Sequence, residues 1–208
     1  MPRSRKRSGE RSARSGKRTS RPAPALRAAK RLFAVACGTA YHSALVFADI
    51  AESSLGIPVI CHTAGEFRYR PPVIGEGDVL IAVSQSGETA DTLEAVRLAA
   101  ERGAYVIAVT NIGSSSIAAL ADFCLVMRAG AEVAVAATKS YNCQLLCLYY
   151  LAAQCLFFKE EKYPDWFSSL NLLPAAAEEA FSRFSEIDGL ADRLKGARAM
   201  YFLGRDRK

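Results

Sequence analysis

Five short apolar runs recur between residues 31 and 127, at intervals that suit strands alternating with helices. Each run is continuously apolar rather than alternating, which is typical of parallel strands covered on both faces. The runs are RLFAVA (31–36), IPVIC (57–61), VLIAVS (79–84), YVIAVT (105–110) and FCLVM (123–127). They predict the five strands of one sheet.

Helical patterns separate these predicted strands. Residues 40–55 carry apolar positions at helical spacing and stop at Gly56, a residue that suits the position after a helix end. Residues 89–102 do the same and stop at Gly103, and a short helix is predicted over 115–121. This alternation predicts an α/β fold with a doubly wound, parallel five-stranded sheet flanked by helices. Right-handed crossovers then place a ligand at the carboxyl ends of the strands.

From about residue 133 onward the pattern becomes wholly helical. It predicts one long helix over 133–159 and one or two more over 164–195. The apolar run AMYFLG (199–204) predicts the first strand of another βαβ unit. The predicted organisation is a basic tail over 1–30, a domain over 31–160, a helical connector over 161–196 and the start of a second, truncated domain over 197–208.

The positive charge is concentrated in the tail. The whole chain has a net charge of +6, but residues 1–31 hold twelve Lys or Arg and one acid, so the remainder is mildly acidic. The tail has almost no apolar residue before Leu26, and we expect it to be disordered because it cannot offset its conformational entropy by burial. Nucleic-acid attraction, a targeting address and a solvated extension without a role all remain open for it.

The cysteines and the most apolar stretch indicate a cytoplasmic protein. Most of the six cysteines lie inside apolar runs and no secretory signal precedes them, which predicts buried, reduced thiols. Cys143 and Cys147 have no nearby His or third Cys, so no metal site is predicted. Residues 143–158 are shorter than the ~20 apolar residues that a membrane span needs. We expect no membrane segment, metal or cofactor.

The most distinctive turn is SQSGET, at the end of the third predicted strand. Ser84, Ser86 and Thr89 supply three hydroxyls and Gln85 an amide, while Gly87 allows a tight turn. The helix beginning near Thr89 offers unpaired N–H groups and the positive end of its dipole. Capping would explain one hydroxyl but not the whole set. The motif therefore predicts a bound phosphate or other anion, held by neutral donors.

Three further segments carry candidate chemistry. CGTAYH at 37–42 repeats the strand–turn–helix layout and places Thr39 at a second helix start. EVAVAATKS at 132–140 opens the long predicted helix, where Lys139 would face either an anion or water. FRYR at 67–70 suits a ligand contact as well as a subunit contact. Neither GxxxxGK[ST] nor GxGxxG occurs, so the usual nucleotide-binding loops are not supported.

The motifs ACGTAYH, GEFRYR, SQSGETADTL, VTNIGSSSIAALAD and VAATKSYNCQL follow one another along the chain. Together they resemble the sugar-isomerase (SIS) domains of the glutamine–fructose-6-phosphate aminotransferase (isomerizing), or glucosamine-6-phosphate synthase, family. The resemblance runs from about residue 31 to residue 208. It implies a flavodoxin-like SIS fold, the first of two SIS lobes, and a hexose 6-phosphate ligand, either fructose 6-phosphate or glucosamine 6-phosphate.

The resemblance also implies roles for individual residues. Val135 would line the sugar site and Lys139 would support it, while the phosphate would be bound by Ser84, Gln85, Ser86, Gly87, Thr89 and Thr39. Two positions depart from the family pattern: Ala40 stands where CGTS has a serine, and Ala137 where ASTK has one. Each lost hydrogen bond is expected to weaken binding by about 0.5–1.5 kcal/mol.

The family's catalytic groups are not matched by this sequence. Its glutaminase domain uses an N-terminal cysteine, whereas Met1 is followed here by Pro2 and a basic tail. The family's glutamate base, ring-opening histidine and Schiff-base lysine belong to the second SIS lobe. We therefore expect no catalytic residue in this chain, and phosphosugar binding without turnover unless a partner chain supplies that lobe.

Assembly and alternative roles follow from the same pattern. Apolar helices over 133–195 predict a homo-oligomer or pairing with a second SIS lobe. An alternative function is a non-catalytic phosphosugar sensor whose basic tail contacts nucleic acid. A further alternative is a degraded gene product without a ligand.

Overall fold

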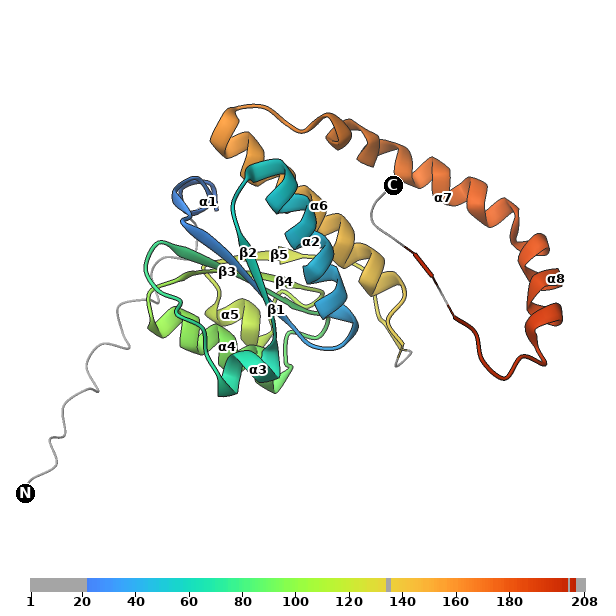
Figure 1. Ribbon diagram of the computed structural model, residues 1–208, viewed down its shortest axis with the longest axis horizontal. Helices are drawn as coiled ribbons and strands as arrows, with labels where there is room; N and C mark the ends of the chain where they lie inside the picture. Colours follow the sequence, from blue (N-terminus) through green and yellow to red (C-terminus); the bar gives the residue numbers. More distant parts are fainter. Residues whose placement is uncertain (1–21, 134–135, 202, 205–208) are drawn as a thin grey trace, which may run out of the picture. The chain divides into compact units, whose positions relative to one another are not determined.

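The computed structural model describes residues 22–133, 136–201 and 203–204 (Figure 1). The chain divides into two compact units, one ending at Pro164 and the other beginning at Asp165. Most of the predicted tail lies outside the described residues. Its last part differs from the prediction, because residues 23–28 form helix α1 (Ala23–Ala28) and Leu26 is buried. Helix α1 packs against α6 (Lys139–Glu160), and Leu26 is its buried large apolar side chain.

A five-stranded, all-parallel sheet forms the centre of the first unit. The strand order is β2-β1-β3-β4-β5, with every neighbouring pair parallel. The strands are β1 (Arg31–Ala36), β2 (Val59–Thr63), β3 (Asp78–Ser84), β4 (Tyr105–Thr110) and β5 (Phe123–Val126). Every residue of β3 is buried, as its continuous apolar run predicts. The doubly wound α/β fold predicted from the sequence is confirmed.

Strand β2 is displaced by two residues from its predicted range of 57–61. Pro58 has no N–H to donate to the ladder, although its carbonyl accepts from Leu32 N at 3.3 Å. Regular pairing begins at Val59 and continues through His62 and Thr63. This strand lies at the edge of the sheet and is only half-buried, so polar residues are tolerated in it.

Helices cover both faces of the sheet (Figure 1). Helices α2 (Thr39–Leu55) and α6 lie on one face, and α3 (Ala64–Tyr69), α4 (Ala90–Glu101) and α5 (Ser116–Leu120) lie on the other. The helices predicted over 40–55, 89–102 and 115–121 are therefore confirmed. Helix α3 was not predicted, and it contains most of the FRYR segment.

Helix α6 begins at Lys139, so the prediction of one helix over 133–159 is wrong at its start. In the predicted range before Lys139, residues 133 and 136–138 are described and are not helical. Glu132 accounts for the difference, because its carboxylate accepts the backbone N–H of Ser140 at 2.9 Å and of Thr138 at 3.4 Å. These are N–H groups of the first turn, which a helix cannot satisfy internally.

The second unit is helical. It contains the 3₁₀ segment η2 (Asp165–Leu172), α7 (Leu173–Ser182) and α8 (Phe184–Leu194), in agreement with the helices predicted over 164–195. The strand predicted over 199–204 is absent, since residues 199–201 and 203–204 adopt no regular structure. A strand needs a neighbour for its backbone groups, and the described residues of the second unit contain no other strand.

The cysteines are less buried than the sequence predicts. All six lie in the described part of the chain and are free, but only Cys155 is fully buried. Burial raises the pKa of Cys155 to about 12, and the pKa of Cys61 and of Cys147 to about 11.

Over the described residues, no helix combines the length and apolar character that a bilayer crossing requires.

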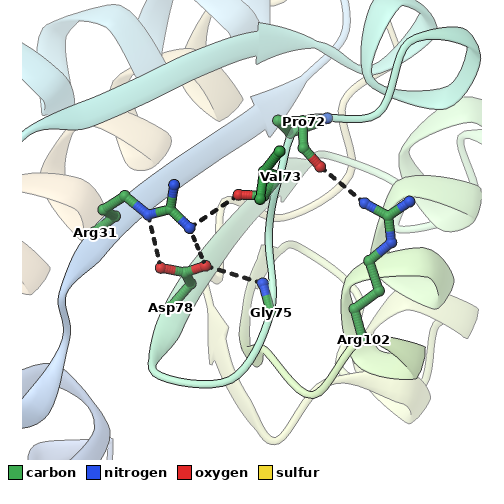
Figure 2. Close-up of polar contacts among 6 residues, drawn as sticks. All are labelled: Arg31, Pro72, Val73, Gly75, Asp78 and Arg102. Carbon is green, nitrogen blue, oxygen red and sulfur yellow. Dashed lines mark hydrogen bonds and ion pairs between the residues drawn. The ribbon is translucent and has the colours of Figure 1, made fainter.

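An ion pair between the buried carboxylate of Asp78 and the partly exposed side chain of Arg31 anchors the chain at the amino ends of β1 and β3 (Figure 2). Asp78, the first residue of β3, is 3% exposed and accepts from Arg31 Nε at 3.0 Å and Arg31 Nη2 at 2.8 Å. Asp78 Oδ2 also accepts from Gly75 N at 2.9 Å, while Arg31 Nη2 donates to Val73 O at 2.9 Å. The pair thus ties β1, β3 and the connection before β3 together.

We expect Asp78→Ala to lower the free energy of unfolding by about 2–4 kcal/mol, because three hydrogen bonds to one buried carboxylate are lost. Urea denaturation would measure this loss. Arg102→Ala is the matched control, since it removes a single exposed bond to Pro72 O and should cost about 1 kcal/mol or less. Equal effects of the two substitutions would contradict the anchoring role.

Candidate functional site

Strands β1 and β3 form the switch point of the sheet. They are adjacent, with Ala36 opposite Val83 at their carboxyl ends. The helix after β1 (α2) and the helix after β3 (α4) lie on opposite faces (Figure 1). Doubly wound sheets bind ligands at this position, outside the carboxyl ends of the strands. The CGTA and SQSGET turns both begin here.

The SQSGET turn gathers three hydroxyls at the start of α4. Ser84, buried at the end of β3, has its Oγ 3.1 Å from Thr89 Oγ1 and accepts from Gly87 N at 3.1 Å. Ser86 Oγ accepts from Glu88 N at 3.2 Å. Gln85, Ser86 and Thr89 are half-buried and thus accessible from outside. The turn therefore presents polar groups at the switch point, as its sequence predicts.

Helix capping does not account for the hydroxyl of Thr89. Thr89 is the N-cap residue of α4, yet among the described residues its side chain accepts from no helix N–H. Its hydroxyl pairs with Ser84 instead. The first N–H groups of the 12-residue helix α4 therefore carry no side-chain cap and add their partial positive charge to the turn.

Gly87 is required where the turn meets the loop between β4 and α5. Its φ is +68°, a conformation that disfavours any side chain. A Cβ at this position would also clash with the side chain of Ser115 and lie 2.8 Å from Thr110 Oγ1. The close approach of the two segments therefore depends on glycine.

The segment from the end of β4 to the first turn of α5 binds two carbonyl groups of the SQSGET turn. Asn111 N donates to Gln85 O at 3.1 Å, and Thr110 Oγ1 lies 3.3 Å from the same oxygen. Ile117 N donates to Gly87 O at 3.1 Å. Because the carbonyl oxygens are occupied from this side, the turn is held in one conformation.

Glu88 was not identified from the sequence, although an acidic residue requires an explanation in a turn that is predicted to bind an anion. Its Oε1 accepts the backbone N–H of Ser116, the first residue of α5, at 2.8 Å. Hydrogen bonding to Ser116 keeps the pKa of Glu88 below its usual value. The carboxylate is therefore directed toward α5 and is compensated there, instead of at the start of α4.

Thr39 is the first residue of α2 and is exposed beside the switch point. It follows Gly38, whose φ of +56° turns the chain from β1 into the helix. Ala40, where the family pattern has a serine, is 9% exposed in the same first turn. The start of α2 thus adds a second helix dipole at this edge of the sheet.

Lys139 and Val135 were the residues expected on the sugar side. Lys139 is the first residue of α6 and is exposed, while Val135 lies outside the described residues. Helix α6 packs along α2, where Ser43 Oγ donates to Gln144 Oε1 at 3.3 Å. This bond joins the second turns of both helices, so the start of α6 lies beside the start of α2, at the carboxyl edge of the sheet.

Glu132 is a second acidic residue that sequence reasoning missed. Besides binding the backbone at the start of α6, its carboxylate accepts from Thr138 Oγ1 at 3.3 Å. Hydrogen bonding to Ser140, with a smaller contribution from Thr138, lowers the pKa of Glu132. The first turn of α6 is therefore already capped by a carboxylate, unlike the start of α4.

Comparisons with known proteins agree with this architecture. The model of the SIS domain family matches residues 25–154. The glutamine–fructose-6-phosphate aminotransferase (isomerizing) of Clostridium tetani is 42% identical over 182 residues, which are 84% of this chain and 29% of the relative. This chain thus spans less than a third of that relative's length.

Solved structures show the same fold. The C-terminal domain of glucosamine-fructose-6-phosphate aminotransferase from Francisella tularensis superposes with a TM-score of 0.78 at 27% identity, over 84% of this chain and 50% of that one. Glucosamine-6-phosphate deaminase from Thermotoga maritima gives a TM-score of 0.58 at 28% identity, over 65% and 42% of the two chains. The chain belongs to the SIS domain family and corresponds to part of the SIS region of the aminotransferase.

Proposed function

We propose that this chain binds a hexose 6-phosphate, either fructose 6-phosphate or glucosamine 6-phosphate, with the phosphate in the SQSGET turn. The observation that carries the proposal is the grouping of the Ser84, Ser86 and Thr89 hydroxyls at the uncapped start of α4. This grouping lies at the switch point of the sheet. The names of the similar proteins refer to phosphosugars of this kind.

The turn divides into supporting and ligand-facing groups. Ser84 is 4% exposed and is occupied with Gly87 N and Thr89 Oγ1, so it orders the turn. Ser86 and Thr89 are half-buried and can direct hydroxyls to phosphate oxygens. Since the turn contains no Lys or Arg, neutral donors and the dipoles of α4 and α2 supply the attraction. Lys139 and Val135 would contact the sugar from the α6 side.

We assign phosphosugar binding to these residues, and not amino transfer or isomerisation. The Clostridium tetani relative is named for amino transfer and isomerisation, and this chain spans 29% of it. In a protein of that length, the site would hold the phosphosugar while groups outside residues 1–208 carried out the chemistry. A partner chain with a second SIS lobe would serve the same purpose.

Calorimetric titration with glucosamine 6-phosphate tests the proposed site. Ser86→Ala should raise Kd about tenfold, because it removes a hydrogen bond to a charged phosphate. Ser169→Ala, an exposed serine of the second unit, is the control and should leave Kd unchanged. The absence of binding heat from the unaltered chain at millimolar ligand would overturn the proposal.

Ala40→Ser should strengthen binding. The new hydroxyl would lie in the first turn of α2, next to Thr39, and one added hydrogen bond corresponds to an affinity gain of about 2–10-fold. Ala48→Ser, further along the same helix, is the matched control. An unchanged Kd for Ala40→Ser would show that the start of α2 does not contact the ligand.

We also propose that the chain self-associates through its second unit. Phe181, Phe184, Ile187 and Leu190 are each 50–57% exposed on α7 and α8. Such a concentration of apolar surface is typical of an interface. Light scattering should give a mass above the 22.5 kDa of one chain, and Ile187→Glu should lower it. A single-chain mass at all concentrations would exclude this interface.

A further inference from the structure

Asn111 directly follows β4 and contacts two segments that are far apart in the sequence. Its backbone N–H donates to Gln85 O in the SQSGET turn at 3.1 Å. Its side-chain Nδ2 donates to Gly130 O at 2.7 Å, and its Oδ1 accepts from Ala129 N at 2.8 Å. Ala129 and Gly130 belong to the β5–α6 connection, of which residues 127–133 and 136–138 are described.

The β5–α6 connection needs an external support at the point where Asn111 binds it. Arg128 has a φ of +55° and Gly130 a φ of +70°, on either side of Ala129. A positive φ is unfavourable for a residue such as arginine and persists where surrounding contacts enforce it. The Asn111 amide satisfies a donor and an acceptor on consecutive residues here, which fixes the direction in which the chain leaves β5.

The same connection reaches the start of α6. Glu132, two residues after Gly130, binds the backbone of Thr138 and Ser140. A continuous series of hydrogen bonds and short chain segments therefore leads from Gln85 through Asn111 to Glu132 and the first turn of α6. Lys139 lies in that turn.

We propose that Asn111 is a positioning residue that sets the sugar side of the site relative to the phosphate turn. This role rests on the proposed function. The phosphate turn itself keeps its support without the Asn111 side chain, because Thr110, Ile117 and the Asn111 backbone bind it. Loss of the side-chain amide should displace the β5–α6 connection alone, and thereby the start of α6.

The asparagine amide suits this position for a chemical reason. It offers a donor and an acceptor at fixed separation, as the paired bonds to Gly130 O and Ala129 N require. Aspartate keeps the acceptor but would place a negative charge against the Gly130 carbonyl. Serine has one oxygen on a shorter side chain and cannot replace both bonds.

The test compares Asn111→Ala and the milder Asn111→Ser in the full chain, by NMR titration with glucosamine 6-phosphate and with inorganic phosphate. We expect Kd for glucosamine 6-phosphate to rise about tenfold in Asn111→Ala, the effect of one to two lost hydrogen bonds, and less in Asn111→Ser. Kd for inorganic phosphate should stay within about twofold of its original value, because the phosphate turn keeps its backbone supports. Asn171→Ala, an exposed asparagine of the second unit, is the control.

Amide hydrogen exchange gives a readout that needs no ligand. Exchange should accelerate at residues 129–132 in both Asn111 variants and stay unchanged at residues 86–88. Unchanged exchange at 129–132, or an equal loss of affinity for both ligands, would overturn the positioning role and leave the proposed function intact. Failure of the unaltered chain to bind either ligand would instead overturn the proposed function.

Discussion

The close approach of Gly87 to the β4–α5 loop is the constraint on which the rest of the site depends. A Cβ at residue 87 would clash with Ser115, so the SQSGET turn and the loop fit together only through glycine. Contact at this distance lets Asn111 and Ile117 bind the carbonyl oxygens of the turn. The proposed ligand would then contact the hydroxyls of Ser86 and Thr89 and the start of α4. Backbone packing on one side of the turn thus fixes the positions of the hydroxyl groups that the turn presents.

The sequence predicted the buried strands closely because a strand that is covered on both faces consists of a continuous run of apolar residues. Strands β1 and β4 match their predicted ranges, and β3 differs by one residue, since all three are covered on both faces. Edge strand β2 was displaced because a half-buried strand accepts polar residues. The start of α6 was misplaced because it depends on the Glu132 carboxylate, a contact that apolar periodicity does not encode.

The candidate site was predicted in part, for a related reason. The hydroxyls of Ser84, Ser86 and Thr89 are adjacent in the sequence, so a local motif reveals them. Glu88 and Asn111 act on backbone groups 18–28 residues away, and only the folded chain brings these partners together. One signal was available for Glu88, since an acid within a turn that is predicted to bind an anion must be compensated by another group. No comparable signal pointed to Asn111.

The Arg31–Asp78 pair has a consequence for how this fold can change. It lies at the amino ends of β1 and β3 (Figure 2), whereas the residues of the candidate site follow their carboxyl ends. The residues that stabilise the fold and the residues of the candidate site therefore lie at opposite ends of the strands and are different residues. Substitutions that stabilise the amino ends of the strands can compensate for the stability that is lost when substitutions at the carboxyl ends change ligand specificity. A fold with this separation can change its ligand specificity while the Arg31–Asp78 pair continues to stabilise it.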